Sequence, residues 1–296
     1  MKKQHLGMAL GFALWCCSAG AGAQGVLDRV AAGGQLVLAH RESSVPFSYV
    51  HQGKPMGYAV DLCLRLAEAV RKKTGMKDMA VAFLQVTPEN RMAMVEQGKA
   101  DLECGSTTNN AERREKVAFT IPHFITGTRL LMKASSKVTR MEDLAGKKLV
   151  STRGTTAYKV AEKAARERLM GFTLLEAPDH ARAVEMVEKG EADAFAMDDV
   201  LLYGLVAQTP GAAKRLAVVG ELLSYEPYAV MFRKADPQLA KLVTDSMRAL
   251  ARDGEIDRQY RRWFLQKLPG GQQRLGLPMS AQLEAIIETL SAAQVE

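Results

Sequence analysis

The chain alternates short apolar segments with longer segments of helical periodicity, and this alternation occurs twice. Residues 58–73 show the pattern most clearly, because apolar side chains recur on one helical face before Gly75 ends the segment. The expected strands are 35–40, 80–86, 100–104, 148–151, 172–176 and 192–197, and the expected helices are 58–73, 90–98, 155–168, 179–189 and 198–207. Such alternation predicts an α/β fold with parallel sheets, arranged as two units of about 100 residues each.

Residues 1–23 differ in composition from the rest of the chain. Lys2 and Lys3 precede an apolar run from Leu6 to Cys17, and small residues follow up to Ala23. This order is typical of a secretory signal, and about twelve apolar residues are too few to cross a bilayer of roughly 30 Å. We therefore expect a signal peptide at 1–23, cleavage after Ala23 and a periplasmic location.

The four cysteines fall into two pairs. Cys16 and Cys17 lie near the end of the apolar run and leave a lipid anchor open, although Trp15 stands where a small residue normally precedes a lipidated cysteine. Cys63 and Cys104 remain after cleavage, and an oxidising compartment permits a disulfide between them. The sequence does not decide whether their Cα atoms come within reach. Neither has the spacing of a metal site, and we expect no metal or cofactor.

The positive charge of the chain is modest and dispersed. The whole chain carries +7, and removal of 1–23 takes away two lysines and no acid, which leaves +5. A mild excess of this kind suits attraction of small anions. No basic run is interleaved with aromatic residues, as a nucleic-acid platform requires, so we expect no nucleic-acid partner.

Polar and charged residues gather directly after the expected strands. In open α/β sheets, ligands lie outside the carboxyl ends of the strands. Arg113 follows one such end, and its planar guanidinium can hold an α-carboxylate through two hydrogen bonds. Asp198 ends another strand and is a candidate partner for an ammonium. The segments at these ends are 40–44, 105–108, 152–156, 179–180 and 198–199.

Arg41 and Arg91 exceed what one α-carboxylate needs, and a second carboxylate on the ligand accounts for them. This excess favours an acidic amino acid. Each residue also has a plain structural interpretation. An arginine at a strand end is more often a surface residue or part of an ion pair, and Asp198 beside Asp199 can simply begin a helix. Their shared location at strand ends favours the ligand site.

Four segments carry a resemblance to a known family. They are 40–49 (HRESSVPFSY), 103–110 (ECGSTTNN), 127–131 (GTRLL) and 197–199 (MDD), and the second is the most specific. Over residues 26–264 the chain resembles the periplasmic solute-binding proteins of polar amino acid ABC transporters, and most closely the members that bind glutamate and aspartate.

The resemblance implies a role for each matched position. Arg113, with Ser106 and Thr108, corresponds to the clamp of the ligand's α-carboxylate, and Asp198 corresponds to the partner of its ammonium. Four more residues fall where that family surrounds the side-chain carboxylate and the far side of the pocket: Arg41, Arg91, Thr156 and His180. Arg129, within a matching motif, corresponds to a hinge residue or a ligand contact.

The implied fold is the type II periplasmic-binding-protein fold, with two lobes and two crossing strands that form a hinge. The crossings are expected near 129–133 and 222–228. Lobe 1 is expected to comprise 24–131 and 225–270, lobe 2 to comprise 132–224, and a C-terminal extension with a helix to comprise 271–296. The implied function is capture of L-glutamate or L-aspartate, without a cofactor, by a monomer that delivers it to the permease subunits of an ABC transporter.

An enzyme on the same scaffold, such as a cyclohexadienyl dehydratase-like lyase, is the main alternative. It needs a positioned general acid or base, and the candidates are His180, Glu42 and Glu103, without a nucleophile elbow or a metal set. A sensing module of a larger receptor is a second alternative and would need a transmembrane or kinase segment, which the sequence does not show. We therefore expect a binding protein rather than an enzyme.

Overall fold

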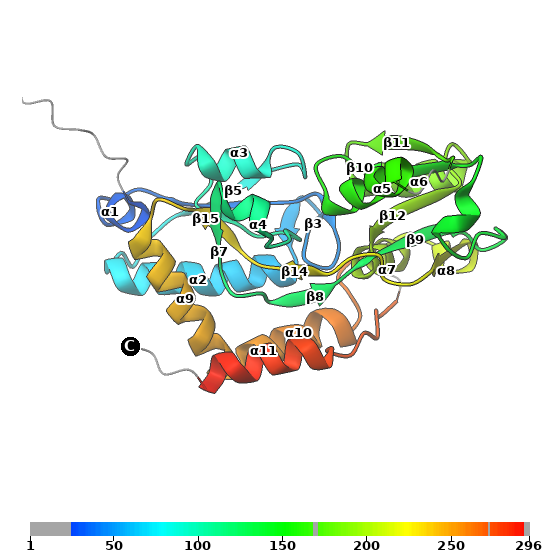
Figure 1. Cartoon of the computed structure of the whole chain (residues 1–296). Coiled ribbons are helices and arrows are strands. Elements are labelled where there is room, and N and C mark those ends of the chain that lie inside the picture. Colours follow the sequence, from blue (N-terminus) through cyan, green and yellow to red (C-terminus); the bar gives the residue numbers. More distant parts are fainter. Residues whose placement is uncertain (1–24, 168–170, 272, 293–296) are drawn as a thin grey trace, which may run out of the picture.

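The computed structural model describes residues 25–167, 171–271 and 273–292. They form two α/β lobes, which lie side by side and are joined by a pair of crossing strands (Figure 1). The signal peptide expected at 1–23, with Cys16 and Cys17, falls outside the described residues. Within these residues, no helix combines the length and the apolar character that a membrane span requires.

The first lobe is built on a five-stranded sheet in the order β5-β1-β6-β15-β7. β1 runs parallel to β5 and β6, whereas β15 runs antiparallel to β6 and β7. The sheet is therefore mixed and not wholly parallel, because β15 leads away from the hinge while β1 and β6 lead toward it. The strands are β1 (Leu36–His40), β5 (Val81–Gln85), β6 (Leu102–Glu103), β7 (Val117–Phe119) and β15 (Met231–Arg233), beside a small sheet of β2 (Ser43–Ser44), β3 (Ser48–His51) and β4 (Lys54–Met56).

Six helices accompany the first sheet in the described part of the chain. In α2, most of the expected apolar stripe is buried in the core, whereas Leu64 is exposed. The buried members of the stripe are Val60, Leu62, Leu66, Ala67 and Val70. The helix ends at Gly75, whose φ of 71° is left-handed and costs glycine no side-chain clash. The helices are α1 (Val26–Ala31), α2 (Tyr58–Thr74), α3 (Arg91–Glu96), α4 (Ala111–Arg114), α9 (Pro237–Arg252) and α10 (Glu255–Tyr260), and α10 continues into the π-helical turn η2 (Arg261–Leu265).

The second lobe repeats this plan with the sheet β11-β10-β12-β9-β13. β10 runs parallel to β11 and β12, and β9 runs antiparallel to β12 and β13. β12 lies in the middle and all five of its residues are buried. The elements are β9 (Thr128–Lys133), η1 (Met141–Leu144), β10 (Lys148–Thr152), α5 (Thr156–Glu167), β11 (Thr173–Ala177), α6 (His180–Lys189), β12 (Ala194–Asp198), α7 (Asp199–Gln208), α8 (Ala212–Arg215) and β13 (Leu216–Val219).

Two strands cross between the lobes, β8 (Phe124–Thr126) and β14 (Glu226–Tyr228). They pair antiparallel, with Thr126 opposite Glu226. The two-lobe architecture with a hinge of two strands is therefore confirmed. The second crossing lies within the expected residues 222–228.

The first crossing lies earlier in the chain than residues 129–133. Those residues belong to β9, between β12 and β13 of the second sheet. Leu130, Leu131 and Met132 are buried there, because both faces of this inner strand are covered. The lobe boundary expected at residue 131 therefore falls inside β9, and the chain leaves the first lobe through β8.

An aromatic cluster anchors the hinge to the first lobe. The ring of Phe124 in β8 stacks on Phe264, with centroids 4.8 Å apart, and Phe264 stacks on Tyr260 at 4.4 Å. Phe47 meets Phe124 edge-on at 4.9 Å. Aromatic pairs of this kind add stability beyond their buried area. These contacts hold Tyr260 and Phe264 against β8.

The C-terminal extension crosses the hinge before it forms α11 (Ala281–Ala292). Residues 273–275 share a hollow with α7 and β13 of the second lobe, and residues 277–278 share another with β8. α11 then packs on α9 (Figure 1), and its residues Leu283, Ile287 and Leu290 are buried. The extension thus packs on the first lobe and lines a hollow beside the second.

A disulfide joins Cys63 of α2 to Cys104, directly after β6, with Cα atoms 6.0 Å apart. Both residues are fully buried. The pairing that the sequence left open is therefore made. It ties α2 to the loop of residues 105–108, which carries candidate ligand contacts.

Candidate ligand-binding site

Two arginines of the first lobe are buried next to the second lobe. Arg41 follows β1 and Arg91 begins α3, and each is 2% exposed. Arg91 Nη2 donates to the Gly154 carbonyl of the second lobe across 3.4 Å. Among the described residues, Nε and Nη1 of Arg41 and Nε of Arg91 have no hydrogen-bond partner. Buried guanidinium donors of this kind favour an anionic ligand, which accepts their hydrogen bonds.

Burial lowers the pKa of both guanidinium groups. The pKa of Arg41 falls to about 10, although the Glu103 carboxylate opposes this change. The pKa of Arg91 lies well below its ordinary value, because of burial first and then the positive charges of Arg113 and Arg41. Arginine stays protonated in proteins, so these cations repel one another and an anion among them is stabilising.

The third arginine, Arg113, lies in the short helix α4. The side chain of Asn110 caps this helix and accepts a hydrogen bond from the Arg113 backbone N–H at 2.9 Å. Arg113 Nη1 donates to the Thr108 carbonyl at 3.0 Å, which holds the guanidinium against the loop of residues 105–108. Ser106 and Thr108 are buried in this loop. The three residues expected to clamp an α-carboxylate therefore lie together.

In the second lobe, Thr156 begins α5 and His180 begins α6. His180 is 1% exposed, and its Nδ1 lies 2.9 Å from Thr152 Oγ1. Its Nε2 has no partner among the described residues. Burial, and then the charges of Arg41 and Arg91, hold the pKa of His180 well below its usual value. A neutral imidazole therefore accompanies the two guanidinium groups.

Asp198 ends β12 and is almost fully buried. Thr128 Oγ1 donates to its Oδ1 at 3.0 Å, and the Tyr228 hydroxyl donates to its Oδ2. Burial, and then the negative charge of Glu226, raise the pKa of Asp198 to about 7. A cation beside this carboxylate would favour its ionised form, so Asp198 suits the ammonium of a ligand.

Glu103, a candidate acid or base in the enzyme alternative, is a buried acid of the first lobe. It is fully buried, and neither carboxylate oxygen has a hydrogen-bond partner in the described structure. A Cβ atom on Gly105 would lie 2.3 Å from Glu103 Oε1 and 3.0 Å from Arg41 Cγ, so both side chains pass against the Gly105 backbone. Glu103 therefore places a negative charge beside the Arg41 guanidinium, which favours the protonated form of Arg41. Its place inside the ECGSTTNN segment is the signal that could have indicated this role.

Glu226 of the hinge strand β14 also belongs to this cluster, although it was not among the expected site residues. It is 3% exposed, and its Oε2 accepts hydrogen bonds from Thr108 Oγ1 at 2.6 Å and from Thr156 Oγ1 at 2.7 Å. One carboxylate oxygen thus connects the hinge, the first lobe and the second lobe. No local pattern around residue 226 indicates such a role.

Further contacts across the lobe interface surround this cluster. Lys159 of the second lobe donates to Glu112 of the first lobe at 2.6 Å. Arg153 Nη1 lies 3.6 Å from Glu89 Oε2. These pairs are exposed, so each contributes little to stability by itself. Together with the contact of Arg91 on Gly154, they show the lobes closed on each other.

Arg129 remains within the second lobe. Its Nε donates to the Gly220 carbonyl and its Nη1 to the Tyr203 hydroxyl, both at 2.8 Å. These contacts hold β9 to neighbouring segments of the same lobe. Arg129 therefore supports the second lobe beside the hinge and does not join the arginine cluster.

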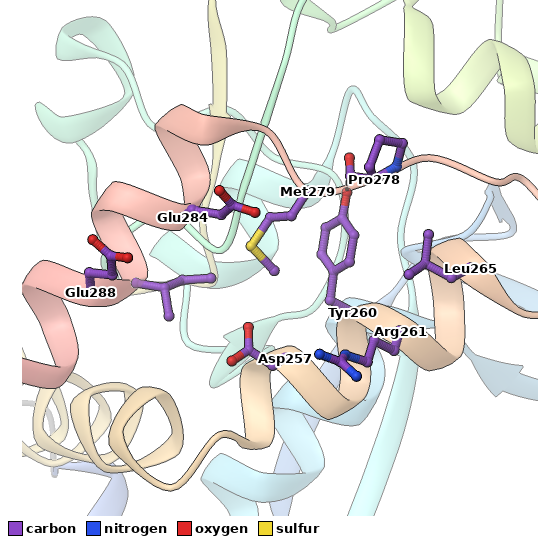
Figure 2. Close-up of a pocket in the computed structure, with 9 residues that line it drawn as sticks. Asp257, Tyr260, Arg261, Leu265, Pro278, Met279, Glu284 and Glu288 are labelled. Carbon is purple, nitrogen blue, oxygen red and sulfur yellow. Dashed lines mark hydrogen bonds between the residues drawn. The ribbon is translucent and has the colours of Figure 1, made fainter.

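A separate groove of about 460 Å³ lies between α10 and the C-terminal extension, and Figure 2 shows its lining side chains. The lining includes Asp257, Glu284 and Glu288 but only one arginine, Arg261. None of the eight expected site residues belongs to it, and its excess of acids is unsuited to an anion. The cluster between the lobes is therefore the candidate site. Across the described residues, no group of His, Cys, Asp and Glu side chains could hold a metal ion.

Two lobes on a two-stranded hinge, with paired charged groups buried between them, define a solute-binding protein of the two-lobe class. The chain belongs to the bacterial extracellular solute-binding proteins, family 3, whose family model matches residues 36–266. The family expected from the sequence is thereby confirmed.

Individual relatives share most of the chain. An L-glutamate/L-aspartate-binding protein of Pseudomonas aeruginosa is 38% identical over 268 residues, which cover 89% of this chain and 87% of that protein. A glutamate/aspartate import solute-binding protein of Escherichia coli is 37% identical over 263 residues, with 88% and 87% covered. The solved structure of an ancestral arginine-binding protein bound to arginine matches with a TM-score of 0.70 and 26% identity, over 78% of this chain and 98% of that chain.

Proposed function

We propose that this protein is exported to the periplasm, captures L-glutamate or L-aspartate between its lobes and delivers it to the permease of an ABC transporter. The observation that carries the proposal is the group of three guanidiniums, from Arg41, Arg91 and Arg113, in one interlobe cluster with Asp198. An acidic amino acid brings two carboxylates and one ammonium, which match these charges. The relatives of Pseudomonas aeruginosa and Escherichia coli, whose names specify glutamate and aspartate, support the same ligand class.

Each residue of the site has a role in this proposal. Arg113, Ser106 and Thr108 hold the α-carboxylate, and Asp198 pairs with the ammonium. The side-chain carboxylate is surrounded by Arg41, Arg91, Thr156 and His180. The neutral state of His180 is consistent with this role, because its Nε2 can donate a hydrogen bond to an anion when Nδ1 accepts one from Thr152.

The fold alone does not choose this ligand, since a chain of the same fold was solved with arginine bound. A second cation on the ligand would meet the charges of Arg41 and Arg91, whose donors are already buried together. Like charges at this range are destabilising. The arginines therefore favour an acidic side chain over a basic one.

Closure of the lobes supplies the binding mechanism. Arg41, Arg91 and Arg113 come from the first lobe, whereas Thr156, His180 and Asp198 come from the second. A ligand that contacts both sets stabilises the closed form more than the open form, and this difference is what drives closure. A single chain contains all these groups, so we propose that the protein acts as a monomer.

The alternative of a lyase on the same scaffold has less support. Two of its three candidate acids or bases, His180 and Glu103, lie beside guanidinium groups, where they can orient or balance charges. The third, Glu42, accepts a hydrogen bond from Gln85 in an exposed pair. The relatives at 37–38% identity are named as binding proteins. Binding without chemical change is therefore the function we propose.

Calorimetric titration of the mature protein against a panel of amino acids tests the proposal. We expect one ligand per chain, tight binding of L-glutamate or L-aspartate, and much weaker binding of neutral and basic amino acids. Heat with neutral or basic amino acids alone would contradict the acidic assignment. The same panel ranks glutamate against aspartate, which differ by one methylene worth about 1–3 kcal/mol. Recovery of the unchanged amino acid after incubation tests for binding without turnover.

A further inference from the structure

The carboxylate of Glu226 occupies a position shared by three parts of the molecule. The residue belongs to the hinge strand β14, and its Oε2 accepts from Thr108 Oγ1 of the first lobe at 2.6 Å. The same oxygen accepts from Thr156 Oγ1 of the second lobe at 2.7 Å. The two hydroxyl oxygens are 3.4 Å apart. Since the bonds to the carboxylate are shorter and charge-assisted, they take the hydroxyl protons.

This arrangement limits what the two threonines can offer to a ligand. A hydroxyl has one proton to donate and two lone pairs that accept. Because both protons point at Glu226, Thr108 and Thr156 present only acceptors to a neighbouring group. An ammonium requires acceptors, whereas a carboxylate requires donors. The hydroxyl side of the site therefore suits the ammonium.

A second buried acid lies in the same region. Asp198 is 4% exposed and accepts hydrogen bonds from Thr128 and Tyr228. The charge of Glu226 acts on Asp198, and together with burial it disfavours ionisation of Asp198. Two buried carboxylates this close are costly unless a cation lies between them. The ligand's ammonium is such a cation.

We propose that Glu226 determines the requirement for an ammonium on the ligand. Its negative charge adds to that of Asp198, and the two hydrogen bonds that it accepts leave the lone pairs of Thr108 and Thr156 free to face the ligand. This inference rests on the proposed function only in that the ligand is an amino acid. It changes the roles of two residues, because the hydroxyls of Thr108 and Thr156 now accept from the ammonium and do not donate to a carboxylate. The α-carboxylate is then held by Arg113 and neighbouring donors, and the side-chain carboxylate by Arg41, Arg91 and His180.

Glu226→Gln tests the inference, because glutamine has a similar shape, can still accept from both threonines and carries no charge. Two ligands are compared by calorimetry, with weak binding measured by displacement: L-glutamate and glutarate, which has both carboxylates but no ammonium. We expect the variant to bind glutamate about 10- to 100-fold more weakly. Glutarate should bind with unchanged or higher affinity, so the preference for glutamate shrinks. An equal loss for both ligands, or no loss for glutamate, would overturn the proposal.

Two further variants separate this role from a structural one. Thr156→Val removes the hydroxyl without changing the hinge strand, and it should also weaken glutamate more than glutarate. If the hydroxyl donated to a carboxylate instead, glutarate would lose as much. Glu112→Gln is the matched control, since Glu112 is an exposed acid that pairs with Lys159 across the lobes and should affect both ligands alike. Thermal unfolding of each variant identifies any loss of folding.

The outcome is separable from that of the acidic-ligand proposal. If the wild-type protein prefers a neutral amino acid, the same comparison is made with that amino acid and its deamino analogue, because every amino acid carries the ammonium. If Glu226→Gln reduces the preference for the neutral amino acid over its deamino analogue, the role of Glu226 is supported even though the ligand is not acidic. A wild-type protein that binds no amino acid overturns both.

Discussion

The Arg91 guanidinium of the first lobe donates to the Gly154 carbonyl of the second lobe across 3.4 Å. Gly154 has a φ of +75°, and a Cβ atom there would lie 2.6 Å from Glu89 Cα and 2.7 Å from the Pro88 carbonyl oxygen. The backbones of the two lobes therefore approach each other closely beside an arginine of the proposed site. Closure of the lobes and the proposed ligand contacts therefore involve neighbouring residues.

Gly154→Ala should block full closure, because the added methyl group meets the backbone of the opposite lobe. We expect glutamate to bind about tenfold more weakly or worse, since ligand affinity includes the free energy of closing the lobes. Gly146→Ala is the matched control. Gly146 has a similar φ of +72° in the same lobe but nothing within 4 Å of its added Cβ. Both variants should lose on the order of 1 kcal/mol of stability to backbone strain. Calorimetry should show weaker binding in the first variant alone.

Arg113→Ala should abolish measurable binding of every amino acid. The α-carboxylate is common to all of them, and loss of its charged hydrogen bonds weakens binding about 100-fold or more. Titration with glutamate, aspartate and glutamine checks this expectation. Retained affinity for any of the three would show that Arg113 does not hold the α-carboxylate.

Arg41→Ala should weaken acidic ligands while sparing a neutral one such as glutamine. The side-chain carboxylate loses a charged partner, which amounts to roughly 10- to 100-fold in affinity. Because Glu103 is buried beside Arg41, the single change also leaves the Glu103 carboxylate without its neighbouring cation, which lowers the stability of the protein. The paired variant Arg41→Met with Glu103→Gln removes both charges together and limits the loss of stability. Equal losses for glutamate and glutamine in the paired variant would refute the assignment.

Glutamate affinity should fall as the pH drops below about 7. Asp198 has its pKa raised to about 7 in the ligand-free protein, so it is largely protonated at lower pH. An ammonium pairs with the ionised form, so binding below this pKa must release a proton. We expect affinity to fall by up to about tenfold per pH unit below the pKa and to level off above it. The pKa of His180 is lowered well below its ordinary value, so His180 does not contribute in this range.

Two measurements check the origin of this pH dependence. Titrations in buffers of different ionisation enthalpy should detect the released proton near pH 6, since about a tenth of Asp198 is ionised there. Asp198→Asn should bind weakly and lose most of the slope. Glu226→Gln removes the neighbouring negative charge, so its profile should move to lower pH. If the pH profile of Glu226→Gln is not shifted, the charge of Glu226 does not act on the pKa of Asp198.

Removal of the disulfide should destabilise the first lobe. The bond closes a loop with a sequence separation of 41 residues, which corresponds to about 4 kcal/mol in the chain-entropy account. The double variant Cys63→Ala, Cys104→Ala and the reduced wild-type protein should both unfold roughly 10 °C lower. Calorimetric melting checks this value. A melting temperature unaffected by reduction would argue against a contribution of the bond to stability.

Local patterns in the chain were sufficient for most of the secondary structure. The helix expected at 58–73 is observed as α2, and the helix expected at 179–189 is observed as α6. Apolar periodicity and terminal glycines specify such elements within a single segment. Strand ends likewise indicated Arg41 and Asp198 as neighbours of a common site. The apolar run of β9 was ambiguous, since a crossing strand and an inner strand look alike over so few residues.

Contacts between distant segments were required for the rest. Glu226 is separated from Thr108 by 118 positions and from Thr156 by 70, and no periodicity or cap relates them. Their shared hydrogen bonds exist only because the hinge brings the lobes together. The disulfide likewise depends on how α2 packs against the first sheet. The alternating strands and helices and the charged strand ends could therefore be predicted from the sequence alone. The direction in which the Thr108 and Thr156 hydroxyls point depends on the folded hinge, because a hydroxyl proton follows whichever acceptor the fold places beside it.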